Sequence, residues 1–136
     1  MRPVLIFVYG TLKRGFANHE VLGSQALYLG EAVTVDRFPL VIMRWASPAM
    51  LHAPGEGHRV VGEAYAVSGD TVARLDTFES NYWRGGLEII LRGKVVSATT
   101  YFRIPGPELR QARQIREFTQ EDNVAYIANK LQGRIN

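Results

Sequence analysis

The sequence predicts a compact, barrel-like α+β domain, and three observations lead to that prediction. Short apolar runs rich in β-branched residues occur along most of the chain, as is typical of strands. Two longer segments have the three-to-four-residue spacing of apolar side chains that indicates a helix. Strands and helices do not alternate regularly, which argues against a parallel α/β sheet.

The first half of the chain is expected to form strands joined by short turns. Residues 4–9 are six apolar residues in a row, and a run without polar alternation indicates a strand covered on both faces. Pro39 suggests a strand start or an edge strand, because proline cannot donate a ladder hydrogen bond. The other expected elements are a short helix at 18–22, strands at 26–35, 38–43 and 60–67, and a turn at 53–57.

A short helix is expected next. Asp70 is a favourable N-cap, and Val72, Leu75 and Phe78 follow it at helical spacing. We expect Leu75 and Phe78 to face the core and the helix to end near residues 80–81.

A hairpin and a second helix complete the predicted domain. Residues 87–91 and 95–102 are expected to pair through a turn at 92–94. Residues 119–122 form a capping-box pattern, which predicts the start of a helix, and Gly133 is expected to stop it. The apolar side chains expected on one face of this helix are Val124, Ile127 and Leu131.

Length and composition indicate one domain with its own core. The chain has 136 residues, of which 46% are hydrophobic and 21% charged, so we expect a single domain over residues 1–136. The absence of cysteine excludes disulfides, thiolate metal sites and cysteine nucleophiles. The opening apolar run is too short for a membrane span or a signal peptide, which favours a cytoplasmic protein that does not enter a membrane.

The net charge of +3 makes the chain mildly basic. A nucleic-acid-binding protein usually concentrates its cations in one patch. The best candidate cluster is Arg103, Arg110, Arg113 and Arg116. Because Glu108 and Glu117 are interspersed among these cations, we interpret the cluster as a solvated surface and expect no nucleic-acid partner.

The loop after the first strand is a candidate anion site. Gly10 and Gly15 allow positive φ, so that successive N–H groups can point into one concavity. The two glycines have the spacing of a nucleotide P-loop. However, Phe16 and Ala17 stand where that loop needs its lysine and its hydroxyl. The loop is therefore predicted to hold a small carboxylate.

A second polar cluster, residues 75–84, contains a candidate general acid or base. Glu79 falls in the last turn of the predicted helix, where the helix dipole disfavours negative charge. If Tyr82 and Trp83 enclose Glu79, burial also raises its pKa, as a proton-transfer group requires. The alternative is an exposed glutamate held by Arg84, which is the more common arrangement for a carboxylate near an arginine.

Other catalytic arrangements find no support in the sequence. No serine lies in a G-x-S-x-G motif, and His19, His52 and His58 match no zinc spacing. Tyr65 and Tyr101, on predicted strands, are expected to be core aromatics with a polar tip.

Three blocks of the chain together resemble the gamma-glutamylcyclotransferase-like superfamily, and most of all its gamma-glutamylamine cyclotransferases. They are residues 7–15 with 18–19 behind them, residues 38–42, and residues 75–80 with Tyr82 and Arg84. The resemblance covers about residues 4 to 103. Residues 103–136, including the capped helix, are expected to be a C-terminal extension.

The resemblance implies a small mixed β-barrel with a few packed helices, and a cofactor-independent enzyme. The substrate would be a small γ-glutamyl amine, whose α-amine attacks its own γ-amide carbon and releases 5-oxoproline and an amine. The resemblance makes Glu79 the general acid/base. It also implies that the glutamyl group is bound by the loop residues Tyr9, Gly10, Thr11 and Leu12.

Some questions remain open at the level of sequence. The donor to the oxyanion could be Tyr82, Tyr101 or a backbone amide. The substrate could be another γ-glutamyl compound, or the chain could be a non-catalytic module that binds a small carboxylate. The sequence does not indicate the oligomeric state or the leaving amine.

Overall fold

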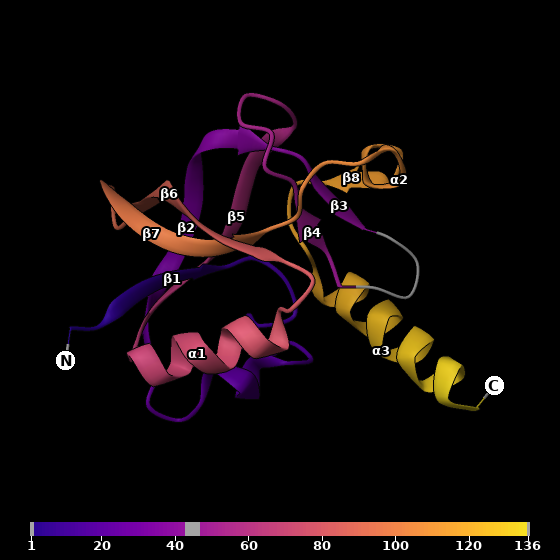
Figure 1. The fold of residues 1–136 in the computed structure, drawn as a ribbon, viewed down its shortest axis with the longest axis horizontal. Coiled ribbons are helices and arrows are strands. Elements are labelled where there is room, and N and C mark those ends of the chain that lie inside the picture. Colours follow the sequence, from indigo (N-terminus) through magenta and orange to yellow (C-terminus); the bar gives the residue numbers. More distant parts are fainter. Residues whose placement is uncertain (1, 43–46, 136) are drawn as a thin grey trace.

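The computed structural model describes residues 2–42 and 47–135, whose strands form two sheets (Figure 1). Five strands close into a barrel, in the spatial order β1 (Val4–Val8), β5 (His58–Val67), β2 (Leu27–Phe38), β6 (Trp83–Leu91) and β7 (Lys94–Phe102). Beside the barrel lies a smaller sheet, in the order β4 (Ala49–Met50), β3 (Leu40–Ile42) and β8 (Arg113–Ile115).

The barrel is mixed because one pairing differs from the rest. β1 runs parallel to β7, with Ile6 opposite Thr99, while the other barrel pairs are antiparallel. This arrangement confirms the predicted α+β class and the mixed barrel. The predicted strand at 38–43 is divided, because Phe38 ends β2 and Pro39 separates it from β3. Residue 43 lies outside the described residues.

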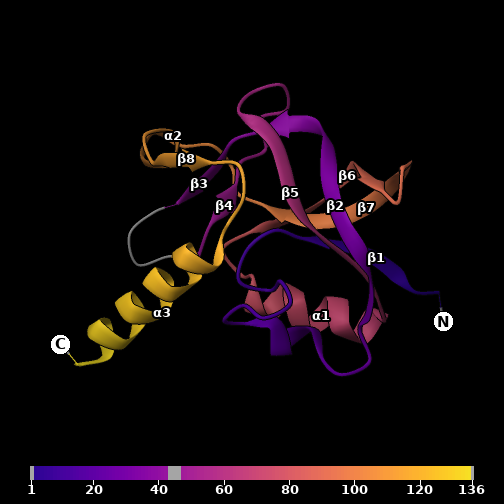
Figure 2. The same ribbon diagram turned by 180° about the vertical axis from the view of Figure 1, so that it is seen from behind.

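β1 is buried on both faces, as its unbroken apolar run predicts. Phe7 packs inside the barrel, whereas Ile6 and Val8 pack on its outer side. The outer side is covered by helix α1 (Gly69–Phe78) and by the 3₁₀ helix η1 (His19–Leu22), which forms within the short helix expected at 18–22 (Figure 2). Side chains at alternate positions of β1 therefore contribute to two different apolar clusters.

Two details of the α1 prediction are wrong. The N-cap is Ser68, whose hydroxyl accepts a hydrogen bond from the N–H of Thr71 at 3.2 Å, and Asp70 lies in the first turn. Leu75 is fully buried, but Phe78 is 42% exposed. Phe78 is the last helical residue, so no following turn covers it.

The β6–β7 hairpin turns where the sequence predicts it. Arg92 and Gly93 both have positive φ, 53° and 78°, and Leu91 pairs directly with Lys94. Two consecutive residues with positive φ are typical of a type I′ turn, which matches the twist of the strands it joins. β6 begins at Trp83, four residues before its predicted start at 87.

The C-terminal segment contains helix α2 (Pro107–Arg110), strand β8 and helix α3 (Gln120–Ile135). The capping box is confirmed, because the Thr119 hydroxyl accepts from the N–H of Asp122 and the Asp122 carboxylate accepts from the N–H of Thr119. The prediction that Gly133 stops the helix is wrong. A glycine inside a helix costs only about 1 kcal/mol, so α3 continues to Ile135.

α3 projects from the barrel on the side of the smaller sheet (Figures 1 and 2). Its apolar face is largely exposed: Val124 is 64% exposed, Ile127 40% and Leu131 53%. The first turn of α3 is joined to the loop after β1. The amide of Asn123 accepts from the N–H of Ala17, and the amide of Gln120 donates to the carbonyl of Gly15.

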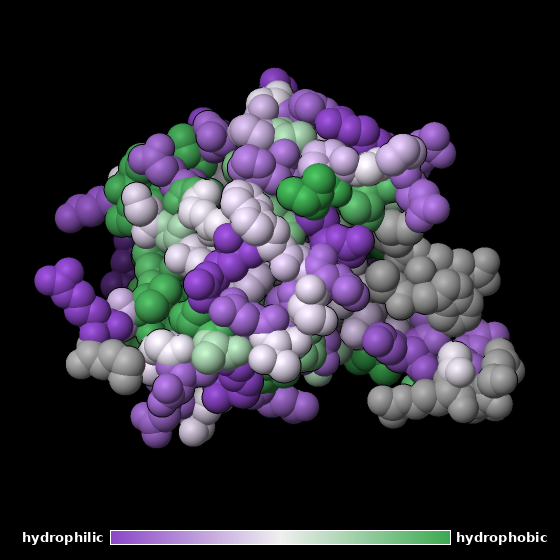
Figure 3. All heavy atoms as spheres, in the orientation of Figure 1, coloured by the Kyte–Doolittle hydropathy of each residue, from purple (hydrophilic) through white to green (hydrophobic). Residues whose placement is uncertain are grey.

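The surface mixes hydrophilic and apolar side chains on the face shown in Figure 3. Two arginines of the basic cluster form salt bridges with acids: Arg110 with Glu56 at 2.9 Å, and Arg113 with Asp122 at 3.4 Å. Within the described residues, no helix is both long and apolar enough to cross a membrane.

Leu75 and Phe78 provide a test of the packing of α1. We expect Leu75→Ala to lower the free energy of unfolding by about 2–5 kcal/mol, because the substitution leaves a cavity under the helix. Phe78→Ala, its matched control, should cost less than half of that loss. Urea unfolding measures both variants, and equal losses would contradict this packing.

Candidate active site

A pocket lies between the end of β1, the end of α1 and the segment that enters β4. All seven residues that the sequence analysis assigned to the site line this pocket. They are Tyr9, Gly10, Thr11, Leu12, Glu79, Tyr82 and Tyr101. The other lining residues are Phe7, Val8, Ser47, Pro48 and Thr100.

The loop after β1 is held in place through its carbonyl groups and one hydroxyl. Asn18 donates from its backbone N–H to the carbonyl of Thr11 at 2.8 Å, and from its amide to the Thr11 hydroxyl at 2.9 Å. The ring of His19 lies 2.9 Å from the carbonyl of Leu12. Residues 18–19, which follow the loop motif in the sequence, therefore support the loop from behind.

The N–H groups of Gly10, Thr11 and Leu12 donate to no acceptor within residues 2–42 and 47–135. Thr11 is only 4% exposed and Leu12 only 6%. Buried backbone N–H groups are nearly always paired, because an unpaired one loses its hydrogen bond to water without replacement. These three groups can therefore bind an anionic oxygen that enters the pocket.

Gly10 is needed for close packing and not for positive φ. Gly15 does have a positive φ of 82°, but Gly10 does not, so the sequence-based reason was wrong for Gly10. A Cβ atom on Gly10 would lie 2.6 Å from Cγ of Pro48, well inside van der Waals contact. The missing side chain lets the loop lie directly against the segment that enters β4.

Glu79 ends α1 as its C-cap residue, and its N–H donates to the carbonyl of Leu75 at 2.7 Å. Burial raises the pKa of the Glu79 carboxyl from 4.5 to about 7. Within the described residues, this carboxyl accepts no hydrogen bond and makes no salt bridge. Glu79 therefore has the near-neutral pKa and the free oxygen atoms that a proton-transfer group needs.

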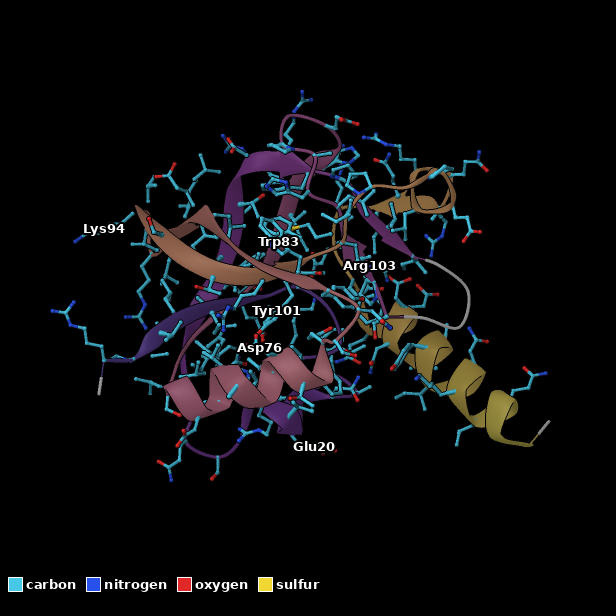
Figure 4. The ribbon with its side chains drawn as sticks, in the orientation of Figure 1. Glu20, Asp76, Trp83, Lys94, Tyr101 and Arg103 are labelled. Atoms are coloured by element: carbon cyan, nitrogen blue, oxygen red, sulfur yellow. The ribbon has the colours of Figure 1, made fainter. Side chains whose placement is uncertain are left out.

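Arg84 binds a different acid from the one considered in the sequence analysis. Its guanidinium pairs with Asp76 at 2.8 Å, and the Tyr101 hydroxyl donates to the other oxygen of Asp76 at 2.6 Å. Figure 4 shows Asp76 and Tyr101 between α1 and the barrel. The alternative in which Arg84 holds Glu79 at the surface is therefore wrong.

Trp83 does not enclose Glu79, contrary to expectation. Its ring packs edge-on against His52, with the ring centroids 4.9 Å apart, and is 47% exposed. Trp83 lies outside the lining of this pocket and lines a neighbouring open hollow with Asp76 and Tyr101. β6 begins at Trp83, so the direction of this side chain is set by the alternation of side chains along the strand. Tyr82 precedes the strand and lines the pocket.

The hydroxyl group of each of the three pocket tyrosines donates a hydrogen bond to another group of the protein. The Tyr9 hydroxyl donates to the carbonyl of Tyr101, and Tyr82 donates to the carbonyl of Pro48. Tyr101 donates to Asp76. Burial raises the pKa of all three phenols above the usual value, so they remain protonated.

Tyr65, the other strand tyrosine, is a core aromatic whose hydroxyl donates to Glu63, as expected.

Sequence reasoning did not find Ser47, Pro48 and Thr100. Ser47 and Pro48 reach the pocket because β4 pairs with β3 and because the N–H of Met50 donates to the Tyr9 hydroxyl. Thr100 donates to the carbonyl of Phe7 at 2.8 Å. No local motif points to these positions, since strand pairing between distant segments creates them.

The histidines do not form a metal site in the part of the chain that the structure describes. His19 contacts Leu12, and His52 lies between Trp83 and Phe102. Across residues 2–42 and 47–135, no three histidine or acidic side chains come together in a way that could hold an ion.

Comparison with known proteins connects this pocket to a family. Residues 6–122 match the family model described as "Gamma-glutamyl cyclotransferase, AIG2-like". Gamma-glutamylaminecyclotransferase of Rattus norvegicus is 47% identical over 92 residues, which are 62% of this chain and 62% of the rat protein. Gamma-glutamylaminecyclotransferase C of Danio rerio is 37% identical over 113 residues, covering 73% of this chain and 74% of the relative.

Solved structures agree with the sequence relatives. The crystal structure of an AIG2-like protein from Mus musculus superposes with a TM-score of 0.82 at 34% identity, covering 89% of this chain and 91% of the mouse chain. The alignment with the rat relative spans just under two thirds of that protein's length.

The raised pKa of Glu79 predicts a pH dependence of stability. Above about pH 4.5 the unfolded chain loses this proton, while the folded protein keeps it until about pH 7. This group therefore contributes stability at low pH. As the pH rises through this window, that contribution is lost and the free energy of unfolding falls by about 2–3 kcal/mol in total. Glu79→Gln removes the loss.

Urea unfolding at about pH 5 and pH 8 measures this effect. The stability of Glu79→Gln relative to the unsubstituted protein should rise by about 2–3 kcal/mol over that range. Asp70→Asn, which changes an exposed acid of the same helix, is the control. A pH-independent difference would contradict a desolvated Glu79.

Proposed function

The chain belongs to the gamma-glutamyl cyclotransferase, AIG2-like family, and on that premise we propose that it converts a γ-glutamyl amine into 5-oxoproline and a free amine. One observation carries the proposal. One pocket holds the desolvated Glu79 carboxyl and the buried N–H groups of the loop after β1, and neither has a hydrogen-bond partner among residues 2–42 and 47–135. A glutamyl group carries both an ammonium and a carboxylate, which complement these two sets of groups.

The loop would hold the α-carboxylate of the substrate. Two of the N–H groups of Gly10, Thr11 and Leu12 can donate to its two oxygens, which replaces the hydrogen bonds those amides lack. Pro48 limits how far the loop can move away, because it lies against Gly10. Fixing the carboxylate in this way orients the rest of the glutamyl group toward Glu79.

Glu79 would prepare the nucleophile. The α-amine of the substrate is mostly ammonium at neutral pH and cannot attack until it loses a proton. A carboxylate with a pKa of about 7 can accept that proton and also return it, because neither protonation state is strongly favoured at neutral pH.

The bond changes take place within the substrate. The free α-amine forms a bond to the γ-carbon and closes a five-membered ring. The leaving nitrogen receives the proton held by Glu79, and its bond to the γ-carbon breaks. The ring nitrogen gives its second proton to the Glu79 carboxylate, and the released amine takes up that proton and leaves as an ammonium ion. Because nucleophile and electrophile belong to one molecule, positioning supplies much of the rate.

The γ-oxygen becomes negative in the intermediate and needs a donor. Tyr82 and Tyr101 each have one hydroxyl proton, and both already donate within the protein. The remaining N–H of the loop at Gly10–Leu12 is therefore the donor that we propose. Of the three alternatives that the sequence left open, this proposal takes the backbone amide.

Glu79→Gln tests the proposed role of the carboxyl. Glutamine keeps the size of the side chain but cannot take up a proton, so 5-oxoproline release should fall by about 10²–10⁴-fold while the fold persists. Chromatographic detection of 5-oxoproline over a panel of γ-glutamyl amines and γ-glutamyl amino acids measures this loss and identifies the preferred leaving group.

Asp70→Asn on the exposed side of α1 is the matched control and should retain activity. Near-normal turnover by Glu79→Gln would show that another group transfers the proton. Binding of 5-oxoproline without turnover of any panel member would favour the non-catalytic module.

A further inference from the structure

Two tyrosines, Tyr82 and Tyr126, lie beside the loop after β1 and the segment that enters β4. The Tyr82 hydroxyl lies 2.9 Å from the carbonyl of Pro48 and 3.5 Å from that of Ser47. On α3, the Tyr126 hydroxyl accepts a hydrogen bond from the amide of Asn18 at 3.5 Å. Both tyrosines are partly buried, and Ser47 and Tyr82 also line the pocket.

Each of these tyrosines has a cation over its ring. The Arg103 guanidinium lies 5.4 Å from the ring centroid of Tyr82, and the Lys130 ammonium lies 5.5 Å from that of Tyr126. Neither cation makes a salt bridge to an acid among the described residues, unlike Arg84, Arg110 and Arg113. We call the five residues Ser47, Tyr82, Arg103, Tyr126 and Lys130 the tyrosine rim.

The tyrosine rim continues from the pocket into a second hollow beside α3. Thr11 lines the pocket and is hydrogen-bonded to Asn18, whose amide lies 3.5 Å from the Tyr126 hydroxyl. The hollow measures about 530 Å³ with its open side. Its lining residues are Asn18, Tyr126, Ile127, Lys130 and Leu131. Figure 4 places Arg103 on the side of the barrel from which α3 projects.

This hollow combines two kinds of chemistry. Ile127 and Leu131 are exposed apolar side chains that can contact an aliphatic chain. Lys130 adds positive charge in the hollow, and Arg103 adds it over the ring of Tyr82. Burial raises the pKa of Tyr126, but hydrogen bonding and the charge of Lys130 together lower it below the usual value.

Resting on the proposed function, we infer that the tyrosine rim binds the leaving half of the substrate and favours an amine with an aliphatic stem that ends in an anionic group. The glutamyl half occupies the pocket, so the leaving nitrogen and its substituent extend past Ser47 toward α3. Most of α3 lies beyond the residues matched by the family model, which end at 122.

Three substrates of equal length test this inference. They are the γ-glutamyl conjugates of 5-aminopentanoate, of pentylamine and of 1,5-diaminopentane, whose far ends are anionic, neutral and cationic. Calorimetric titration into Glu79→Gln measures binding without turnover. We expect the anionic conjugate to bind about three- to tenfold more tightly than the neutral one, with the cationic one weakest, because partly exposed ion pairs contribute modestly. High salt should shrink the difference.

Substitutions of the two cations test whether these residues cause the preference for the anionic conjugate. Lys130→Gln and Arg103→Gln, each combined with Glu79→Gln, should reduce the advantage of the anionic conjugate and leave the affinity for the neutral one nearly unchanged. Lys94→Gln, at the far tip of the hairpin (Figure 4), is the matched control for lost positive charge and should change nothing.

The outcomes separate this inference from the proposed function. Equal binding of the three conjugates, or a preference that neither rim substitution changes, overturns the inference. The expected preference without any release of 5-oxoproline by the unsubstituted protein supports the rim and contradicts the proposed enzyme. Failure of every conjugate to bind contradicts both.

Discussion

One buried hydroxyl joins the barrel to the smaller sheet and so determines the shape of the pocket. The Tyr9 hydroxyl donates to the carbonyl of Tyr101 on β7 at 2.6 Å and accepts from the N–H of Met50 on β4 at 3.2 Å. Burial raises the pKa of Tyr9 well above its usual value, so both bonds persist. Because Pro48 immediately precedes β4, this junction also fixes Pro48 against Gly10, where no side chain would fit.

The pocket formed in this way contains buried N–H groups and a buried carboxyl that lower the stability of the fold. Buried N–H groups that have no acceptor in the described part of the chain cost about 1–3 kcal/mol each, and a desolvated Glu79 costs stability as soon as it ionises. Proteins retain such costs at functional sites, where a ligand compensates for them. A glutamyl group is suited to this role, since its carboxylate matches the amides and its ammonium matches Glu79. The cost to stability and the proposed chemistry thus have the same origin.

The sequence predicted what local patterns control. The loop at 10–15, the strand before it, the hairpin turn and the capping box each depend on neighbouring residues, and Glu79 came from a short motif. The errors arose where distant segments meet. Arg84 binds Asp76 and not Glu79, and Trp83 faces away from the pocket, because the start of β6 sets their directions. Pro48 was missed because it reaches Gly10 only through the pairing of β4.

In the proposed function, the amides of Gly10, Thr11 and Leu12 bind a carboxylate next to Glu79. A titration of the ¹⁵N-labelled protein with 5-oxoproline, followed by two-dimensional NMR, tests this binding. We expect saturable downfield shifts of the three loop N–H resonances, with those of the hairpin turn at Arg92 and Gly93 unmoved. Saturable binding that leaves the loop resonances unchanged would contradict it.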